Sequence, residues 1–434
     1  MIRGTGDSRR IAHPPAGPAE TRPALHRARR FPGFATLLAL LSLCALALPT
    51  AATAGKAPPP PPREFFGLVP QGNLPSSADF ARMGQAKVGT ARLVANWRQI
   101  EPRDDVWNFG SLDAYVGNLA AVGIRPFPVF FHSAPFVSSD DLRLPVHSAQ
   151  AREQWREFVA MVVQRYGAGG EYWSTAYPIQ HPGAQPLPVT AWQLWNEQNG
   201  PKHAHYPNPT EYAELVKISH EAIASRDPAA DLVLGGMFGT PTGEGGIDAW
   251  DFLSAVYASP GAKESFDAIA LHPYSPDIKG IKEQVNKMRK VVKKNADEQA
   301  KNKLKKAKKK LKRAKRSDRK AKIKKARKRV KAAKRGLQQA DIWVTEIGWG
   351  SEGASTSRLV KGLEGQATLL RKSFELFEKQ RKKWKIASVL WYTWRDVNRV
   401  GAPCDWCATA GLFRQDGVTT KPAWSEYVRL TGGS

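Results

Sequence analysis

Eight short apolar runs, separated by segments with helical spacing, recur along most of this 434-residue chain. Nearly every position of a run is apolar, as in parallel strands that are covered on both faces. Eightfold alternation of such strands with helices predicts an α/β fold, a (β/α)₈ TIM barrel. The expected strands are Phe65–Val69, Ala91–Asn96, Ile124–Phe131, Ala191–Trp195, Leu232–Gly236, Phe266–Leu271, Ile342–Thr345 and Ala387–Thr393. The expected helices are Leu112–Val122, Ala151–Tyr166, Glu211–Ser225, Trp250–Ala258, Gly365–Gln380 and Trp424–Leu430.

The formal net charge of +27 belongs to one segment and not to the whole chain. Residues 281–336 hold 28 of the 66 Lys and Arg and only 4 of the 39 Asp and Glu. The remainder carries 38 basic and 35 acidic residues, a net charge of +3. An anionic partner, if there is one, should therefore bind locally at this segment.

The basic segment predicts a Lys/Arg-rich helical hairpin, residues 296–338, inserted in the sixth helix region of the barrel. Its apolar residues follow a heptad spacing that breaks phase at Ser317-Asp318 and then resumes. A barrel helix runs away from the carboxyl ends of the strands, so the hairpin should project from the opposite end of the barrel. It could anchor the protein to an anionic polymer or surface, or it could be a solvated insertion with no dedicated partner.

The amino-terminal residues predict export. Arginines precede an apolar run from Phe34 to Leu48, and Ala52-Thr-Ala54 is a small-x-small cleavage site. This run is too short to span a membrane. We expect a secretion signal peptide at residues 1–54, a Pro-rich linker at 55–63, and one catalytic domain at 64–434, with no transmembrane segment in the mature chain. The mature protein should be secreted, extracellular or wall-associated, and monomeric.

Two cysteines remain after the signal, Cys404 and Cys407. In an exported protein this pair favours a small disulfide over a metal site, because no second cysteine pair completes a set of four ligands. His203 and His205 have a spacing that could suit a metal, but no carboxylates cluster with them in the sequence, and loop or substrate contacts are the favoured interpretation. We expect no metal and no cofactor.

Two glutamates carry the expected chemistry. Glu197 follows Asn196 at the end of the fourth predicted strand, and Glu346 ends the seventh. In a parallel barrel both side chains would reach the same mouth from opposite sides. Two facing carboxyl groups are what glycosidic bond hydrolysis requires, one as acid and base and the other as nucleophile or base.

These residues resemble the clan of retaining (β/α)₈ glycosidases that includes glycoside hydrolase families 5 and 39, the cellulase- and β-xylosidase-like enzymes. The resemblance covers roughly Phe65 to Leu430 without the basic hairpin. It implies that Glu197 is the acid/base and Glu346 the nucleophile. The clan pattern also implies substrate-binding residues at the ends of other strands, and the matching positions are Asn196, Arg92, His132, His272, Tyr274 and Trp394.

Physical chemistry gives each of these residues an expected role. Burial and the charge of Glu346 should raise the pKa of Glu197, while Glu346 should stay ionised with Arg92 and Tyr274 as donors. Asn196 would bind the sugar 2-hydroxyl, the two histidines would bond around the reacting sugar, and Trp394 would offer it an apolar face.

The sequence thus predicts a secreted retaining O-glycosyl hydrolase acting on a β-linked oligo- or polysaccharide. A transglycosylase would share this site. The alternative from another class is an inactive or weakly active barrel that binds a wall polymer or other polyanion. It would do so through the basic hairpin of residues 296–338, called the basic arm below.

Overall fold

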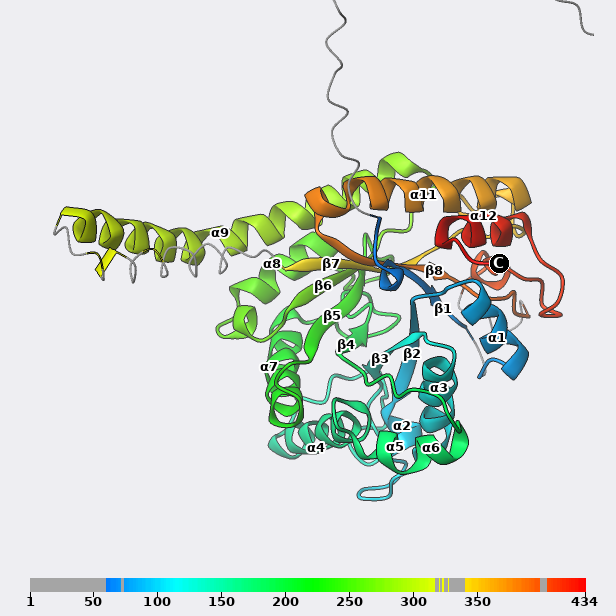
Figure 1. Ribbon diagram of the computed structural model, residues 1–434, viewed down its shortest axis with the longest axis horizontal. Coiled ribbons are helices and arrows are strands. Elements are labelled where there is room, and N and C mark those ends of the chain that lie inside the picture. Colours follow the sequence, from blue (N-terminus) through cyan, green and yellow to red (C-terminus); the bar gives the residue numbers. More distant parts are fainter. Residues whose placement is uncertain are drawn as a thin grey trace, which may run out of the picture. The chain divides into compact units, whose positions relative to one another are not determined.

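The computed structural model describes residues 60–71, 74–316, 320, 322–323, 327, 340–398 and 404–434, and for residues 296–304 the backbone alone. Eight parallel strands pair in chain order, and the last pairs with the first, so that the barrel closes (Figure 1). The predicted (β/α)₈ barrel is confirmed. Its strands are β1 Phe66–Val69, β2 Thr90–Asn96, β3 Arg125–Phe131, β4 Ala191–Asn196, β5 Asp231–Phe238, β6 Ala268–His272, β7 Asp341–Ile347 and β8 Ile386–Tyr392.

The helices surround the barrel. They are α1 Ser77–Gln85, α2 Trp97–Ile100, α3 Gly110–Ala121, α4 Ala149–Tyr166, α5 Glu171–Ser174, α6 Ala176–Gln180, α7 Pro209–Arg226, α8 Ala249–Ala258, α9 Ile278–Arg316, α11 Gly362–Trp384 and α12 Pro422–Thr431, with short 3₁₀ turns at Arg63–Phe65, Ala262–Glu264 and Cys407–Thr409. Local signals fix several helix starts. The Asn208 side chain accepts hydrogen bonds from the first turn of α7, and Ser76 and Asp79 form a reciprocal capping box on α1.

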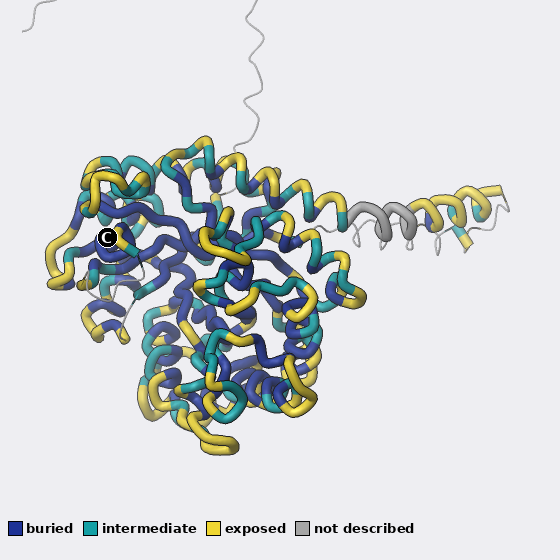
Figure 2. Tube along the Cα trace, turned by 180° about the vertical axis from the view of Figure 1, so that it is seen from behind, coloured by how far each residue is buried: buried dark blue, intermediate teal, exposed yellow. Residues whose placement is uncertain are grey.

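The strands are almost wholly buried, which explains their continuous apolar runs. Every residue of β1 and β6 is buried, and the strands lie at the centre of the molecule with the more exposed helices outside (Figure 2). Polar side chains within such strands therefore stand out. Arg92, Gln193 and Thr345 are buried polar residues on β2, β4 and β7, and they all take part in the site described below.

Helix α9 is the unusual element, with 39 residues in one continuous helix (Figure 1). Its first part packs on the barrel through Ile281, Val285, Met288 and Val292, all buried. Beyond the barrel, Ala307 is buried and Leu311 is partly covered, whereas the lysines and arginines between Lys305 and Arg316 are exposed. Ala307 and Leu311, which are less exposed, belong to the apolar residues for which the sequence predicts a heptad spacing. Most of the predicted return helix, the signal peptide and all but the last residues of the linker lie outside the described residues.

No described helix combines the length and the apolar character that crossing a membrane requires.

A buried ion pair joins two parts of the segment that follows β8, and a hydrogen bond from the same lysine reaches the segment after β7. The Lys421 side chain, fully buried at the start of α12, donates to Asp396 Oδ1 at 2.6 Å, to Ser351 Oγ at 3.0 Å and to the Thr409 carbonyl at 2.9 Å. Removing one partner of a buried pair leaves the other charge without compensation.

We therefore predict that Lys421→Met lowers the free energy of unfolding by about 3–5 kcal/mol, measured by guanidinium denaturation. Lys279→Met is the matched control, because Lys279 lies 4.0 Å from Glu283 in an exposed pair. The control should change stability by less than about 0.5 kcal/mol. Equal effects of the two substitutions would contradict the structural role of Lys421.

Candidate active site

Glu197 and Glu346 meet at the carboxyl ends of the strands. Glu197 directly follows β4, and Glu346 is the penultimate residue of β7. One carboxylate oxygen of each and one ring nitrogen of His272 lie within 4.8 Å of one another. Their carboxylate side chains are only 14% and 11% exposed. Two acidic groups are thus held close together in a site largely withdrawn from water.

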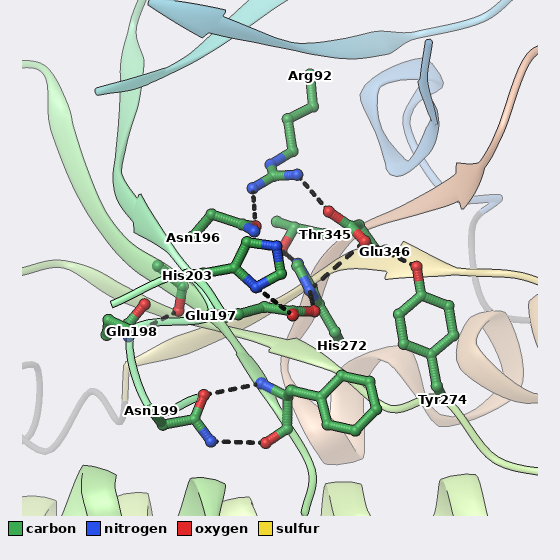
Figure 3. A network of polar contacts seen from close by, with 12 residues as sticks. Arg92, Asn196, Glu197, Gln198, Asn199, His203, His272, Tyr274, Thr345 and Glu346 are labelled. Carbon is green, nitrogen blue, oxygen red and sulfur yellow. Dashed lines mark hydrogen bonds and ion pairs between the residues drawn. The ribbon is translucent and has the colours of Figure 1, made fainter. Parts of the chain in front are cut away.

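Arg92 holds one side of this pair. Its guanidinium donates to Glu346 Oε1 at 2.5 Å, to Asn196 Oδ1 at 2.7 Å and to Gln193 Oε1 at 2.6 Å. The Arg92 side chain is 6% exposed. Because a buried guanidinium needs partners for its donors, these contacts fix Glu346 and Asn196 together with the arginine (Figure 3).

Tyr274 completes the surroundings of Glu346. Its hydroxyl donates to Glu346 Oε2 at 2.7 Å. Burial, and after it the charge of Glu346, raises the pKa of Tyr274 well above its ordinary value. The phenol therefore remains a hydrogen-bond donor, and each oxygen of Glu346 accepts a bond from a fixed group.

Glu197 lies between two histidines. His272 Nδ1 is 2.8 Å from its Oε1, and His203 Nδ1 is 3.0 Å from its Oε2. Burial acts to raise the pKa of Glu197, but hydrogen bonds from His203 and His272 outweigh it and hold this pKa below its ordinary range. The expected raised pKa is therefore wrong, because that expectation counted burial and Glu346 but neither histidine.

The protonation of His203 follows from the same contact. Burial acts to lower the pKa of His203, yet its hydrogen bond to Glu197 and the charges of both glutamates raise it overall. The proton of this pair thus resides on the imidazole, beside an ionised Glu197. The Trp195 indole holds the loop by donating to the His203 carbonyl at 2.7 Å.

A chain of hydrogen bonds connects Arg92 to Glu197. The Gln193 amide donates to Thr345 Oγ1 at 3.3 Å, and Thr345 Oγ1 is 3.0 Å from His272 Nε2. A carboxylate can only accept, so His272 Nδ1 donates to the ionised Glu197, and in a neutral imidazole Nε2 is then the acceptor for the Thr345 hydroxyl. The chain thus sets the tautomer of His272.

The backbone at these strand ends adopts an uncommon conformation. His132, Trp195 and Glu197 have positive φ angles of 67°, 69° and 44°, in the left-handed region that non-glycine residues rarely adopt. Asn199 braces the loop by bonding both the amide and the carbonyl of Phe238, at 3.0 and 2.7 Å (Figure 3). The left-handed turn at Glu197 is part of what places its side chain between the two histidines.

Two cavities meet over the carboxylates and share Asn196, His203, Glu346 and Tyr392 in their walls. The smaller, about 300 Å³, is lined by Glu197, Tyr274 and Trp406 and by the loops after β4, β5 and β8. The larger, about 850 Å³, is lined by Arg92 and His132 and by residues that follow β1, β2 and β3. His132 Nδ1 lies 3.0 Å from Asp141, and burial lowers its pKa.

The expectation that Trp394 offers an apolar face to the sugar is wrong. It is 1% exposed, donates its indole N–H to Asp79 at 2.9 Å and packs against Phe413 and Trp424. It lines neither cavity, because its ring and its N–H are both satisfied in the core below the β8–α12 segment. Aromatic side chains that do line the cavities include Tyr392 and Trp406, whose rings lie 6.0 Å apart. A disulfide joins Cys404 to Cys407, on either side of Trp406.

Sequence reasoning missed three members of the site and the role of a fourth. Gln193 and Thr345 could have been found as polar residues within apolar strands, whereas Trp406 had no distinguishing signal among 14 tryptophans. His203 was placed among loop or substrate contacts, without a link to Glu197. Its position depends on the path of a loop that no periodicity describes.

Among the described residues, Glu197, His272 and Glu346 are close enough together to suit a metal ion. Their donor atoms are already engaged. Arg92 and Tyr274 donate to Glu346, and His272 Nδ1 donates to Glu197. A positive guanidinium 2.5 Å from a carboxylate oxygen would also repel a cation. The group is better explained as a hydrogen-bonded network.

Comparison with known proteins supports the predicted resemblance. No family model matches the chain. A curated β-xylosidase of Geobacillus stearothermophilus is 26% identical over 194 residues, 40% of this chain and 35% of that protein. The chain thus spans about a third of the length of this relative.

Solved structures share the barrel. A family 39 glycoside hydrolase from the gut symbiont Bacteroides cellulosilyticus WH2 has 19% identity and a TM-score of 0.54, over 86% of this chain and 64% of that one. A monomeric β-xylosidase from Caulobacter crescentus CB15 has 16% identity and a TM-score of 0.52, over 86% and 69%. The family 39 enzyme from Xanthomonas axonopodis pv. citri has 15% identity and a TM-score of 0.53, over 86% and 67%. The resemblance to this group of barrel proteins is confirmed.

The two histidines at Glu197 give a testable pH dependence. Removing His203 takes away a donor and a positive charge that favour the ionised carboxylate, so His203→Gln should raise the pKa of Glu197. We expect the titration midpoint of the Glu197 carboxyl carbon, followed by ¹³C NMR and assigned by comparison with Glu197→Gln, to move upward by roughly 1 to 3 pH units.

His205→Gln is the control for this titration, because His205 lies in the same loop and pairs with Asp140 at 2.7 Å. It should leave the midpoint unchanged. A downward shift in His203→Gln, or equal shifts in both variants, would contradict the assignment of the proton to His203.

Proposed function

We propose that this chain is a retaining glycoside hydrolase that cleaves a β-linked oligo- or polysaccharide, with Glu197 as acid/base and Glu346 as nucleophile. The observation that carries the proposal is the approach of the two carboxylates, with oxygens within 4.8 Å. Retaining glycosidases place these groups about 5–5.5 Å apart, whereas inverting enzymes leave about 6.5–9.5 Å for a water molecule. The spacing therefore favours double displacement.

In the first step Glu346 attacks the anomeric carbon as the bond to the leaving oxygen breaks. Arg92 and Tyr274 hold one oxygen each, so the carboxylate is presented in a single orientation. Asn196 is kept in place by Arg92 Nη2, which leaves its amide N–H groups for a sugar hydroxyl. Such a bond to the 2-hydroxyl strengthens in the oxocarbenium-like transition state.

The leaving oxygen needs a proton, which Glu197 must supply. Before a sugar binds, this proton resides on His203, 3.0 Å from Glu197 Oε2. A sugar that displaces water from the site disfavours the charged pair, so that the proton passes to the carboxylate and both groups become neutral. In the second step water attacks the glycosyl ester on Glu346, and Glu197 takes its proton.

We also propose that the protein is exported and that its basic arm holds it on an anionic polymer, such as a wall polyanion. Two observations support this proposal, the signal-like amino terminus and the nine exposed Lys and Arg side chains between Lys305 and Arg316. This stretch of about 18 Å of helix carries about one positive charge per 2 Å, close to the density of negative charge on a polyanion such as DNA.

The two glutamates can be tested separately. We predict that Glu346→Ala abolishes hydrolysis of all glycosides, because no nucleophile remains. Glu197→Ala should lose roughly 10²–10⁴-fold in kcat on substrates with poor leaving groups and much less on dinitrophenyl glycosides, which need no acid. Azide should restore Glu197→Ala and give a glycosyl azide of retained configuration.

Glu221→Ala, which removes an exposed glutamate on α7, is the control and should behave as the wild-type protein. Inverted configuration of the first product in NMR, or unaltered activity of Glu346→Ala, would rule out the retaining mechanism.

The arm makes a second prediction. Deleting residues 296–338 and joining the ends with a short Gly/Ser linker should leave kcat/KM on aryl glycosides within about twofold, since the arm leaves the barrel far from the carboxylates. The same deletion should abolish retention on a polyphosphate or heparin column at about 0.15 M salt. Retention of the deleted protein at the same salt would contradict the arm's role.

A further inference from the structure

The site lies within a cleft that extends to both sides of the carboxylates. The two cavities share Asn196, His203, Glu346 and Tyr392 in their walls, so they adjoin each other at Glu346. The smaller side has about 300 Å³ and the larger about 850 Å³. An enzyme that removes single terminal sugars needs only one closed pocket beyond the nucleophile. Here, in contrast, cavities extend on both sides of the carboxylates.

The chemistry orients the substrate in the cleft. The acid must reach the leaving oxygen, and Glu197 lines only the smaller cavity. The leaving group therefore lies on the smaller side, against Tyr274 and Trp406. The sugar that is attacked lies over Glu346, and the sugars preceding it extend into the larger cavity, beyond Arg92 and Asn196.

The floor of the larger cavity includes an exposed apolar residue on a barrel strand. Val94 is 50% exposed, the one exposed position in β2. Side chains alternate along a strand, so Val94 is on the same face as Arg92 and Asn96 and lies between them at the mouth. An apolar group on the floor of a polar cleft offers a surface for the face of a sugar ring.

The walls of the larger cavity carry polar side chains beside apolar ones. The polar residues include Asn96, Arg98, Gln99, Asn108 and Ser111, and the apolar ones include Leu74, Leu112 and Tyr115. Hydroxyl-rich ligands need such donors and acceptors around an apolar floor. Drug-sized ligands occupy pockets of roughly 300–1,000 Å³. The larger cavity, at about 850 Å³, lies near the upper end of this range and has nearly three times the volume of the smaller one, so it is the side with more room for several sugar rings.

We propose that the larger cavity is a binding site for at least two sugar units of the glycone, so that the protein releases intact oligosaccharides instead of single sugars. This inference rests on the proposed function and adds the length of the substrate and the direction in which it binds. The recognised ligand is a β-linked oligosaccharide whose non-reducing part extends past Arg92 toward Val94.

Paired aryl glycosides test the proposal. With 4-nitrophenyl xyloside and xylobioside, and with the glucoside and cellobioside, we expect kcat/KM at least tenfold higher for the disaccharide of the preferred pair. Chromatography should show the intact disaccharide as the first product. Equal or better cleavage of the monosaccharide glycoside, or stepwise release of single sugars, would overturn the proposal.

Val94→Trp probes the larger cavity directly. Its indole fills the floor, so the ratio of kcat/KM for the disaccharide to that for the monosaccharide should fall at least tenfold. Val418→Trp is the matched control, because Val418 is 68% exposed and lines neither cavity. An unchanged ratio in Val94→Trp would refute the assignment of this cavity to the glycone.

A binding measurement separates this inference from the proposed activity. Calorimetry with Glu346→Ala should show at least tenfold tighter binding of the trisaccharide of the preferred series than of the free monosaccharide. If no glycoside is hydrolysed by the wild-type protein but this preference is found, the proposed function fails and the extended site stands. Equal affinities would reject the extended site whether or not the protein hydrolyses glycosides.

Discussion

The guanidinium of Arg92 is the group on which the mouth of the barrel depends. It is buried, permanently charged, and bonded to side chains on two other strands, β4 and β7. A buried charge requires such partners, so the presence of Arg92 dictates that Gln193, Asn196 and Glu346 be polar and correctly placed. Removing any of the three would leave donors without acceptors in a nearly dry site. The polar groups at the strand ends therefore form one unit.

This unit also connects the two glutamates chemically. Arg92 binds Glu346 directly, and through Gln193, Thr345 and His272 it reaches Glu197. The chain ends in a hydrogen bond donated to one oxygen of Glu197, while His203 occupies the other. Each carboxylate oxygen of the two glutamates thus lies beside a hydrogen-bond donor. In this arrangement the proton required for acid catalysis is stored beside the carboxylate and not on it.

The barrel could be predicted because its strands are covered on both faces, which makes their sequences continuously apolar. The same regularity marks Glu197 and Glu346 as polar residues at strand ends and Arg92 as a polar residue within a strand. The position of Trp394 could not be predicted, since its neighbours Phe413 and Trp424 and its acceptor Asp79 are contributed by other segments. His203 depends on a loop path fixed by the bonds of Trp195 and Asn199. Helix α1 was also missed, because its nine residues show too few turns for a clear period.

The left-handed backbone at His132, Trp195 and Glu197 has a consequence for heat resistance. Non-glycine residues in this conformation destabilise a protein by roughly 1–3 kcal/mol each. Trp195 is fully buried, so its loss would cost more in packing than the strain it relieves. Glycine at Glu197 would relieve strain without emptying the core, so a substitution that makes this barrel more resistant to heat also removes a glutamate from its mouth. Selection for thermal stability alone would therefore erode the site, and persistence of these residues in a lineage would indicate that selection also acts on what the mouth does.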